Sequence, residues 1–125
     1  MTKTALIVTG VAALLLGAQA MAETVVESWS CEVNDKKTLE DVQAANMKWL
    51  EFVNSSVDGE VSSSLVVPIV GDWGEFLFVD SYRDLAHWSA VKAALDTEEG
   101  NAVEQSLQEV FTCSGNRLWR DMPTK

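Results

Sequence analysis

The chain has 125 residues and is strongly acidic, with 19 Asp and Glu residues against nine Lys and Arg and a formal net charge of −10. Nucleic acid is excluded as an expected partner, because so few basic side chains cannot neutralise a phosphate backbone. The same balance excludes the polybasic mode of binding to a membrane surface.

Residues 1–22 have the pattern of a secretory signal peptide. A single charged residue, Lys3, precedes an apolar run that ends at Leu16, and small residues follow it. Cleavage is expected after Ala22, with the bond after Ala20 as the alternative. The apolar run is too short and too interrupted for a membrane anchor. We therefore expect a periplasmic or secreted protein that has no membrane attachment after cleavage.

Residues 23–125 are long enough for a single domain and too short for two. The first predicted element is a strand over residues 25–33, because Glu27, Trp29 and Cys31 alternate with neighbours of the opposite face. After a polar turn, Thr38 has the properties of an N-cap. It begins a predicted helix that runs to about residue 53.

The second half of the chain predicts a hairpin, a helix in two pieces and a last strand. In chain order these are strands at 65–70 and 75–82, a helix at 85–95 capped by Asp84, a helical piece from Thr97, and a strand at 112–120. Pro68 cannot donate a ladder hydrogen bond, so the strand that contains it is expected at a sheet edge or a bulge.

This order of elements predicts a ferredoxin-like α+β fold, βαββαβ. The fold has a four-stranded antiparallel sheet, with its first and third strands in the middle and its helices on one face. Cys31 and Cys113 then lie at the same edge of the sheet, on neighbouring strands. With one His in the chain and no C-x-x-C spacing, we expect a structural disulfide and no metal site.

Both faces of the predicted hairpin are apolar. Phe76 and Phe78 point to one side of the sheet, whereas Leu77 and Val79 point to the other, and the helices can cover only one side. An exposed apolar face of this size is rare in monomers, so we expect a homodimer packed sheet against sheet. The alternative is a monomer in which the Ser-rich loop predicted at residues 54–64, or the C-terminal tail, covers that face.

A short chain of this order with two apolar sheet faces resembles the dimeric α+β barrel superfamily. Residues 76–88 are similar to its usual passage from the third strand to the second helix. The superfamily includes cofactor-free antibiotic-biosynthesis monooxygenases, haem-degrading monooxygenases, muconolactone-isomerase-like enzymes and stress-responsive barrel proteins. The resemblance implies a ligand pocket between sheet and helices.

Three of the five Trp residues are predicted to converge in that region, with Trp29 on the sheet and Trp49 and Trp88 on the helices. They are candidates for the walls of a flat apolar pocket. The alternative is that large aromatic side chains fill the core of a small domain.

Asn46 interrupts the apolar stripe of the first predicted helix. A buried amide needs a hydrogen-bond partner, which could be a backbone group, a buried water or a ligand. In the monooxygenase branch of the superfamily, Asn and Trp side chains orient an aromatic substrate. The resemblance implies that role for Asn46 together with Trp49.

His87 is the only His of the chain and flanks the apolar stripe of the second helix. It is a further pocket candidate, although a lone His near a helix start commonly lies at the surface. The haem-degrading branch needs an axial His on this segment, and His87 comes earlier than that ligand falls. No cofactor is therefore expected.

The sequence as a whole predicts an exported dimeric α+β barrel that binds a small apolar or aromatic ligand between sheet and helices. It assigns no catalytic residue and leaves enzymatic activity undecided. Two alternatives stay open. One is a structural or interaction protein without a ligand pocket, and the other is a cofactor-free monooxygenase or isomerase.

Overall fold

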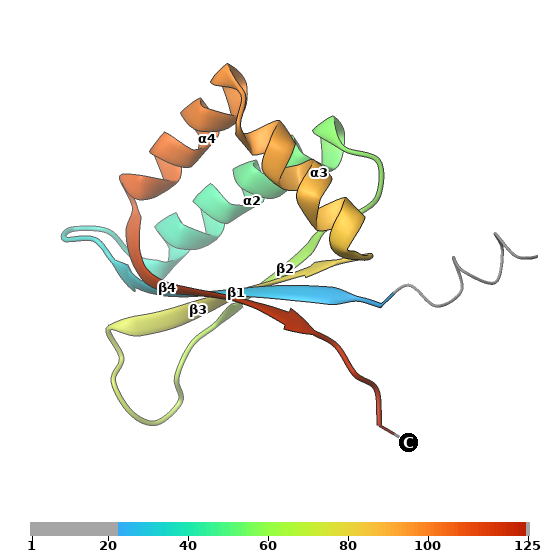
Figure 1. Cartoon of the computed structure of the whole chain (residues 1–125). Coiled ribbons are helices and arrows are strands. Elements are labelled where there is room, and N and C mark those ends of the chain that lie inside the picture. Colours follow the sequence, from blue (N-terminus) through green and yellow to red (C-terminus); the bar gives the residue numbers. More distant parts are fainter. Residues whose placement is uncertain (1–22, 125) are drawn as a thin grey trace, which may run out of the picture.

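A computed structural model gives the structure of residues 23–124, so the predicted signal peptide lies outside the described residues. The elements are β1 (Val25–Val33), α2 (Leu39–Ser56), β2 (Ser62–Val66), β3 (Glu75–Tyr82), α3 (Leu85–Leu95), α4 (Glu98–Gln108) and β4 (Phe111–Arg120) (Figure 1). Within these residues no helix is both long enough and apolar enough to cross a membrane.

The four strands form one antiparallel sheet in the order β2-β3-β1-β4, and the three helices cover one of its faces (Figure 1). The predicted ferredoxin-like architecture is therefore confirmed. Cys31 and Cys113 are register partners on β1 and β4, and their sulfurs are bonded at 1.99 Å.

The three helices begin at the side chains expected to cap them. The Thr38 hydroxyl accepts from the Asp41 amide while the Asp41 carboxylate accepts from the Thr38 amide, which is a complete capping box. Asp84 accepts from the amide of His87, and Thr97 from that of Gly100. These contacts satisfy amides that have no partner within their own helix.

The prediction for β2 is wrong, because the strand covers 62–66 and not 65–70. Pro68 has no N–H to donate, and the chain leaves the sheet just before it. Ile69 and Val70 then lie in the loop that leads to β3, 85% and 89% exposed. This loop projects on the side of the sheet away from the helices (Figure 1). The Ser-rich segment that was predicted to be a loop supplies most of the strand instead.

The core lies between the sheet and the helices. One cluster of buried side chains includes Trp49, Val53 and Val91, and a second is formed around Val42 and Phe78. Alternation along the strands places one set of side chains in these clusters and turns the other set to the opposite face.

That opposite face carries apolar side chains that the helices do not cover. Leu77 is 38% exposed, Val66 46% and Trp119 47%, and the strand register places all three on this side with Val26 and Val79. The Trp119 indole donates to the Ser28 hydroxyl at 2.8 Å on the same side. Residues 62–64 of the Ser-rich segment lie within β2 itself, and the loop after β2 and the C-terminal segment project from the sheet on the side away from the helices (Figure 1).

Candidate functional site

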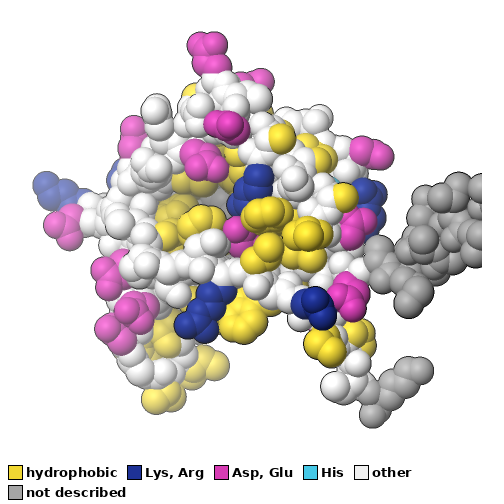
Figure 2. Space-filling view, viewed as in Figure 1, with side chains coloured by type: hydrophobic (Ala, Val, Ile, Leu, Met, Phe, Trp, Pro, Cys, Tyr) yellow, Lys and Arg dark blue, Asp and Glu magenta, His cyan; other side chains and the backbone are white. Residues whose placement is uncertain are grey.

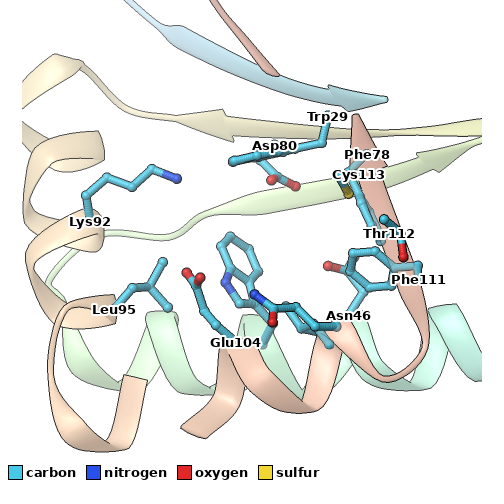
Figure 3. Close-up of a pocket in the computed structure, with 13 residues that line it drawn as sticks. Trp29, Asn46, Phe78, Asp80, Lys92, Leu95, Glu104, Phe111, Thr112 and Cys113 are labelled. Carbon is cyan, nitrogen blue, oxygen red and sulfur yellow. The ribbon is translucent and has the colours of Figure 1, made fainter. Parts of the chain in front are cut away.

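A cavity of about 590 Å³ lies between the sheet and the three helices. Figure 2 shows a hollow lined by apolar side chains in this region. Strands β1, β3 and β4 provide its floor, and α2, α3 and α4 provide its walls. Its lining combines apolar side chains with six polar or charged ones, which are Asn46, Asp80, Lys92, Glu104, Gln108 and Thr112, and Figure 3 shows most of these around the cavity. A cavity with apolar walls and convergent polar groups is typical of a small-molecule site.

Three of the five candidate side chains line this cavity, namely Trp29, Asn46 and Trp49. Trp88 does not line it and instead packs, partly buried, against the cluster that contains Trp49, Val53 and Val91. The Trp88 indole nitrogen is buried and has no hydrogen-bond partner within residues 23–124. The expected convergence of three indoles thus reduces to two.

His87 lies outside the cavity and is buried, at 2% exposure, where a surface position was the common expectation. Its Nδ1 accepts from the Arg83 amide at 3.1 Å, so the ring nitrogen that faces away is the protonated one when the ring is neutral. That nitrogen packs on Gly59. The φ of Gly59 is +102°, a conformation that any other residue could adopt only with strain. His87 therefore fills a packing position, and a shallow separate groove runs past it.

The Asn46 amide belongs to a chain of hydrogen bonds that ends on a buried carboxylate. Its Nδ2 donates to the Ser63 hydroxyl at 2.9 Å, and that hydroxyl donates to Asp80 Oδ1 at 2.5 Å. The partner that a buried amide requires is thus supplied by β2. The chain fixes how both the amide and the carboxylate are oriented at the cavity.

Asp80 is 4% exposed on β3 and lines the cavity. Burial raises the pKa of its carboxyl from an ordinary 3.8 to about 6, since the apolar surroundings disfavour the charged form. The nearby Glu27 carboxylate raises the pKa further, whereas the Ser63 hydrogen bond and the Lys92 ammonium lower it. The Asp80 carboxyl consequently changes its protonation state around pH 6.

Glu27 is the second buried carboxylate, and its partners are complete. The Lys92 ammonium lies 2.6 Å from Oε1, and the Asn116 amide donates to Oε2 at 3.0 Å. The Tyr82 hydroxyl donates to Oε1 at 3.4 Å. Burial, followed by the two nearby carboxylates, raises the pKa of the Tyr82 hydroxyl above its ordinary value, so the phenol stays protonated.

Lys92 is the cation of the site. Its ammonium lies 5.5 Å from the centroid of the Trp29 ring and 5.7 Å from that of Trp88, so two aromatic faces hold it. Figure 3 shows its side chain reaching toward Asp80, with Glu104 and Asn46 on the other walls. One cation therefore serves two buried carboxylates and is bonded to Glu27.

We did not predict Glu27, Asp80 and Lys92 as site residues from the sequence, although their positions indicated a role. Alternate residues of a strand face the same side of the sheet. Glu27 is therefore on the side of Trp29 and Cys31, and Asp80 is on the side of Phe76 and Phe78, which is the side that the helices cover. A charged residue at such a position needs a partner or a function.

Residues 23–124 contain no cluster of three or more His, Cys, Asp or Glu side chains placed to hold a metal ion. The chemistry that the described side chains offer is hydrogen bonding, proton exchange at Asp80, cationic charge at Lys92 and contact with indole faces.

No protein-family model matches the sequence, and no curated protein sequence matches it. Several solved structures are similar in fold. SnoaB, a cofactor-independent oxygenase from Streptomyces nogalater, matches with a TM-score of 0.62 and 14% identity, over 82% of this chain and 97% of that protein.

A NIPSNAP family protein from Agrobacterium tumefaciens matches with a TM-score of 0.60 and 13% identity, over 83% of this chain and 90% of its own. A proposed antibiotic biosynthesis monooxygenase from Caulobacter crescentus matches with a TM-score of 0.56 and 10% identity, over 83% of this chain and 92% of that protein. These likenesses show that the chain has a ferredoxin-like α+β fold. Fold alone does not carry activity from these proteins to this one.

Proposed function

We propose that the protein binds a small planar, apolar or aromatic molecule in the cavity between sheet and helices. The cavity itself carries this proposal, because a small domain that used its Trp residues only for packing would fill this space. Its volume lies within the usual range for small-molecule sites. The alternative of a structural protein without a pocket accounts for the fold and leaves the cavity unexplained.

The walls of the cavity favour a flat ligand. Trp29 on β1 and Trp49 on α2 both line the cavity, so two indoles contribute aromatic surface to it. Asn46 is held by Ser63 and presents its amide group at the same wall as Trp49. An amide beside an indole can orient a ring that bears an oxygen substituent.

Trp49→Phe is expected to weaken binding of an aromatic ring ketone such as 2-tetralone about tenfold, because the smaller ring loses contact area with the ligand. Isothermal titration calorimetry of the oxidised protein measures the change. Trp73→Phe is the matched control, since Trp73 is 73% exposed and lies far from the cavity walls. Equal affinities of the two variants for 2-tetralone would place the ligand elsewhere.

A second candidate function is cofactor-free catalysis, as an oxygenase or an isomerase. The observation that favours it is the presence of a hydrogen-bonded carboxylate, Asp80, at the wall of the same cavity as Asn46. The likeness in fold to SnoaB, an oxygenase that works without a cofactor, is consistent with it. This candidate requires turnover without added metal or flavin, and that turnover has to be lost in Asn46→Ala.

We infer that the functional unit is a homodimer packed through the open sheet face. What supports this is the apolar character of that face, where Leu77, Val66 and Trp119 stay exposed in a single copy. Leu77→Glu is expected to convert the dimer to a monomer, because a buried unpaired carboxylate opposes association. Sedimentation velocity measures the mass. An unchanged dimer in Leu77→Glu would contradict this assembly.

We also infer that the protein is exported and works in the periplasm or outside the cell. The signal-peptide pattern of residues 1–22 supports this, as does a disulfide, which persists in oxidising compartments. The intact mass of the protein from an exporting host reports whether cleavage follows Ala20 or Ala22. A full-length mass would contradict export by cleavage.

A further inference from the structure

The two buried carboxylates of the site differ in what holds them. Glu27 has a cation and two hydrogen-bond donors on its two oxygens. Asp80 has one donor, the Ser63 hydroxyl, on Oδ1. Within residues 23–124 its Oδ2 accepts no hydrogen bond, and the carboxylate points into the cavity (Figure 3).

The charges around Asp80 come from every element packed on it. Glu27 on β1 and Tyr82 on β3 flank it, Lys92 reaches in from α3, and Glu104 lines the cavity from α4. On α2 the facing group is the neutral amide of Asn46, which acts through Ser63. The only cation among them is already bonded to Glu27.

A carboxylate buried without a bonded cation is costly for the fold. The ion pair with Lys92 offsets the cost of burying Glu27. No cation is bonded to Asp80 in the same way, so the ion pair does not explain why a second carboxylate is buried here. Asp80 keeps an oxygen with free lone pairs at the wall of a cavity that has room for a ring. Such an arrangement is suited to take a proton from a bound molecule.

We propose that Asp80 is the proton acceptor for a ring ketone that carries an acidic C–H next to its carbonyl, with Lys92 placed to stabilise the enolate that forms. This inference rests on the proposed function, because it places the ligand between Trp29 and Trp49. It adds the chemical class of the ligand and a role for the two charged groups.

The step balances without any further reactant. The C–H bond next to the carbonyl breaks, its proton forms an O–H bond on Asp80 Oδ2, and the electron pair moves to the carbonyl oxygen as an enolate. Lys92 supplies positive charge on the same side of the cavity, where aromatic rings hold its ammonium. Return of the proton to the same or to another carbon completes an exchange or an isomerisation.

The test follows exchange of the C1 protons of 2-tetralone for deuterium in D2O by proton NMR, with the oxidised protein as catalyst. Asp80→Asn preserves the shape and leaves an oxygen for Ser63, but cannot accept the proton. We expect it to lower the protein-dependent rate about 100-fold or more. Glu51→Gln removes an exposed carboxyl on α2 that does not line the cavity and is expected to retain the wild-type rate.

The pH profile of the wild type is a second readout that needs no variant. The rate is expected to rise with pH, to reach half its maximum near pH 6 and to level off at higher pH, where Asp80 is ionised. Exposed lysines also promote such exchange, but their contribution is identical in Asp80→Asn.

Two failures are distinguishable. If calorimetry shows that 2-tetralone binds but Asp80→Asn exchanges it at the wild-type rate, or the profile is flat through pH 6, the role of Asp80 is overturned and the binding site stands. If neither 2-tetralone nor 2-indanone binds the wild type, the proposed function falls, and this inference falls with it.

Discussion

Replacing both Cys31 and Cys113 with Ala is expected to lower the free energy of unfolding by about 4 kcal/mol. The disulfide joins positions 82 residues apart, and closing so long a loop removes much of the conformational freedom of the unfolded chain. Cys31 is also 2% exposed and packs in the cluster that contains Val42 and Phe76, so the change to Ala removes buried contacts as well.

Urea unfolding of the oxidised wild type and of the double variant at one pH measures this loss. Reduction of the wild type with dithiothreitol is the matched control, because it opens the same loop without changing the sequence. The reduced protein is expected to lose most of the same stability. Equal midpoints for the oxidised wild type and the Ala variant would contradict a stabilising role for the bond.

Asp80→Asn is expected to stabilise the protein above about pH 6 and to have little effect on stability near pH 4. The pKa of Asp80 is raised to about 6 in the fold, so the folded state binds this proton more tightly than the unfolded state does. The wild type therefore loses stability as pH rises from about 4 to about 6. The full loss is about 3 kcal/mol, and Asn does not incur it.

The measurement is a series of urea unfolding curves for both proteins between pH 4 and pH 8. The difference between their free energies of unfolding isolates Asp80, because every other titrating group is common to both. It should grow through the window between the unfolded and folded pKa values and then stay constant. A difference that does not change with pH would mean that Asp80 ionises in the fold as it does in the unfolded chain.

Strand alternation and cap residues were enough to predict the topology from the sequence. The period of two along residues 25–33 placed Trp29 and Cys31 on one face, and the order of elements then brought Cys31 next to Cys113. Thr38 and Asp84 marked helix starts because their side chains satisfy amides that no turn of the helix can. These are local properties, and a single sequence carries them.

The bounds of β2 depended on tertiary contacts and were predicted wrongly. A run of Ser has little strand propensity of its own. Residues 62–64 become strand because β3 pairs with them and because Ser63 bonds to Asp80. The apolar run that follows looked like the strand, yet Pro68 ends the pairing.

The cavity and its charged lining were predictable only in part. Trp29, Trp49 and Asn46 follow from the facing of their elements, and the facing of Glu27 and Asp80 was equally available. The link from Asn46 to Asp80 was not, because Ser63 lay in a predicted loop. The volume of the cavity depends on how the three helices pack against the sheet, and no local sequence pattern determines that packing.

The central claim is that a small planar molecule binds between Trp29 and Trp49, and the indole N–H signals of the five Trp residues test it most directly. In a nitrogen–proton NMR titration with 2-tetralone, assigned through single Trp→Phe variants, the signals of Trp29 and Trp49 are expected to shift and saturate together. Trp73, which is exposed and away from the cavity, should not move. Shifts confined to Trp73 and Trp119, or none at any indole, would contradict the claim.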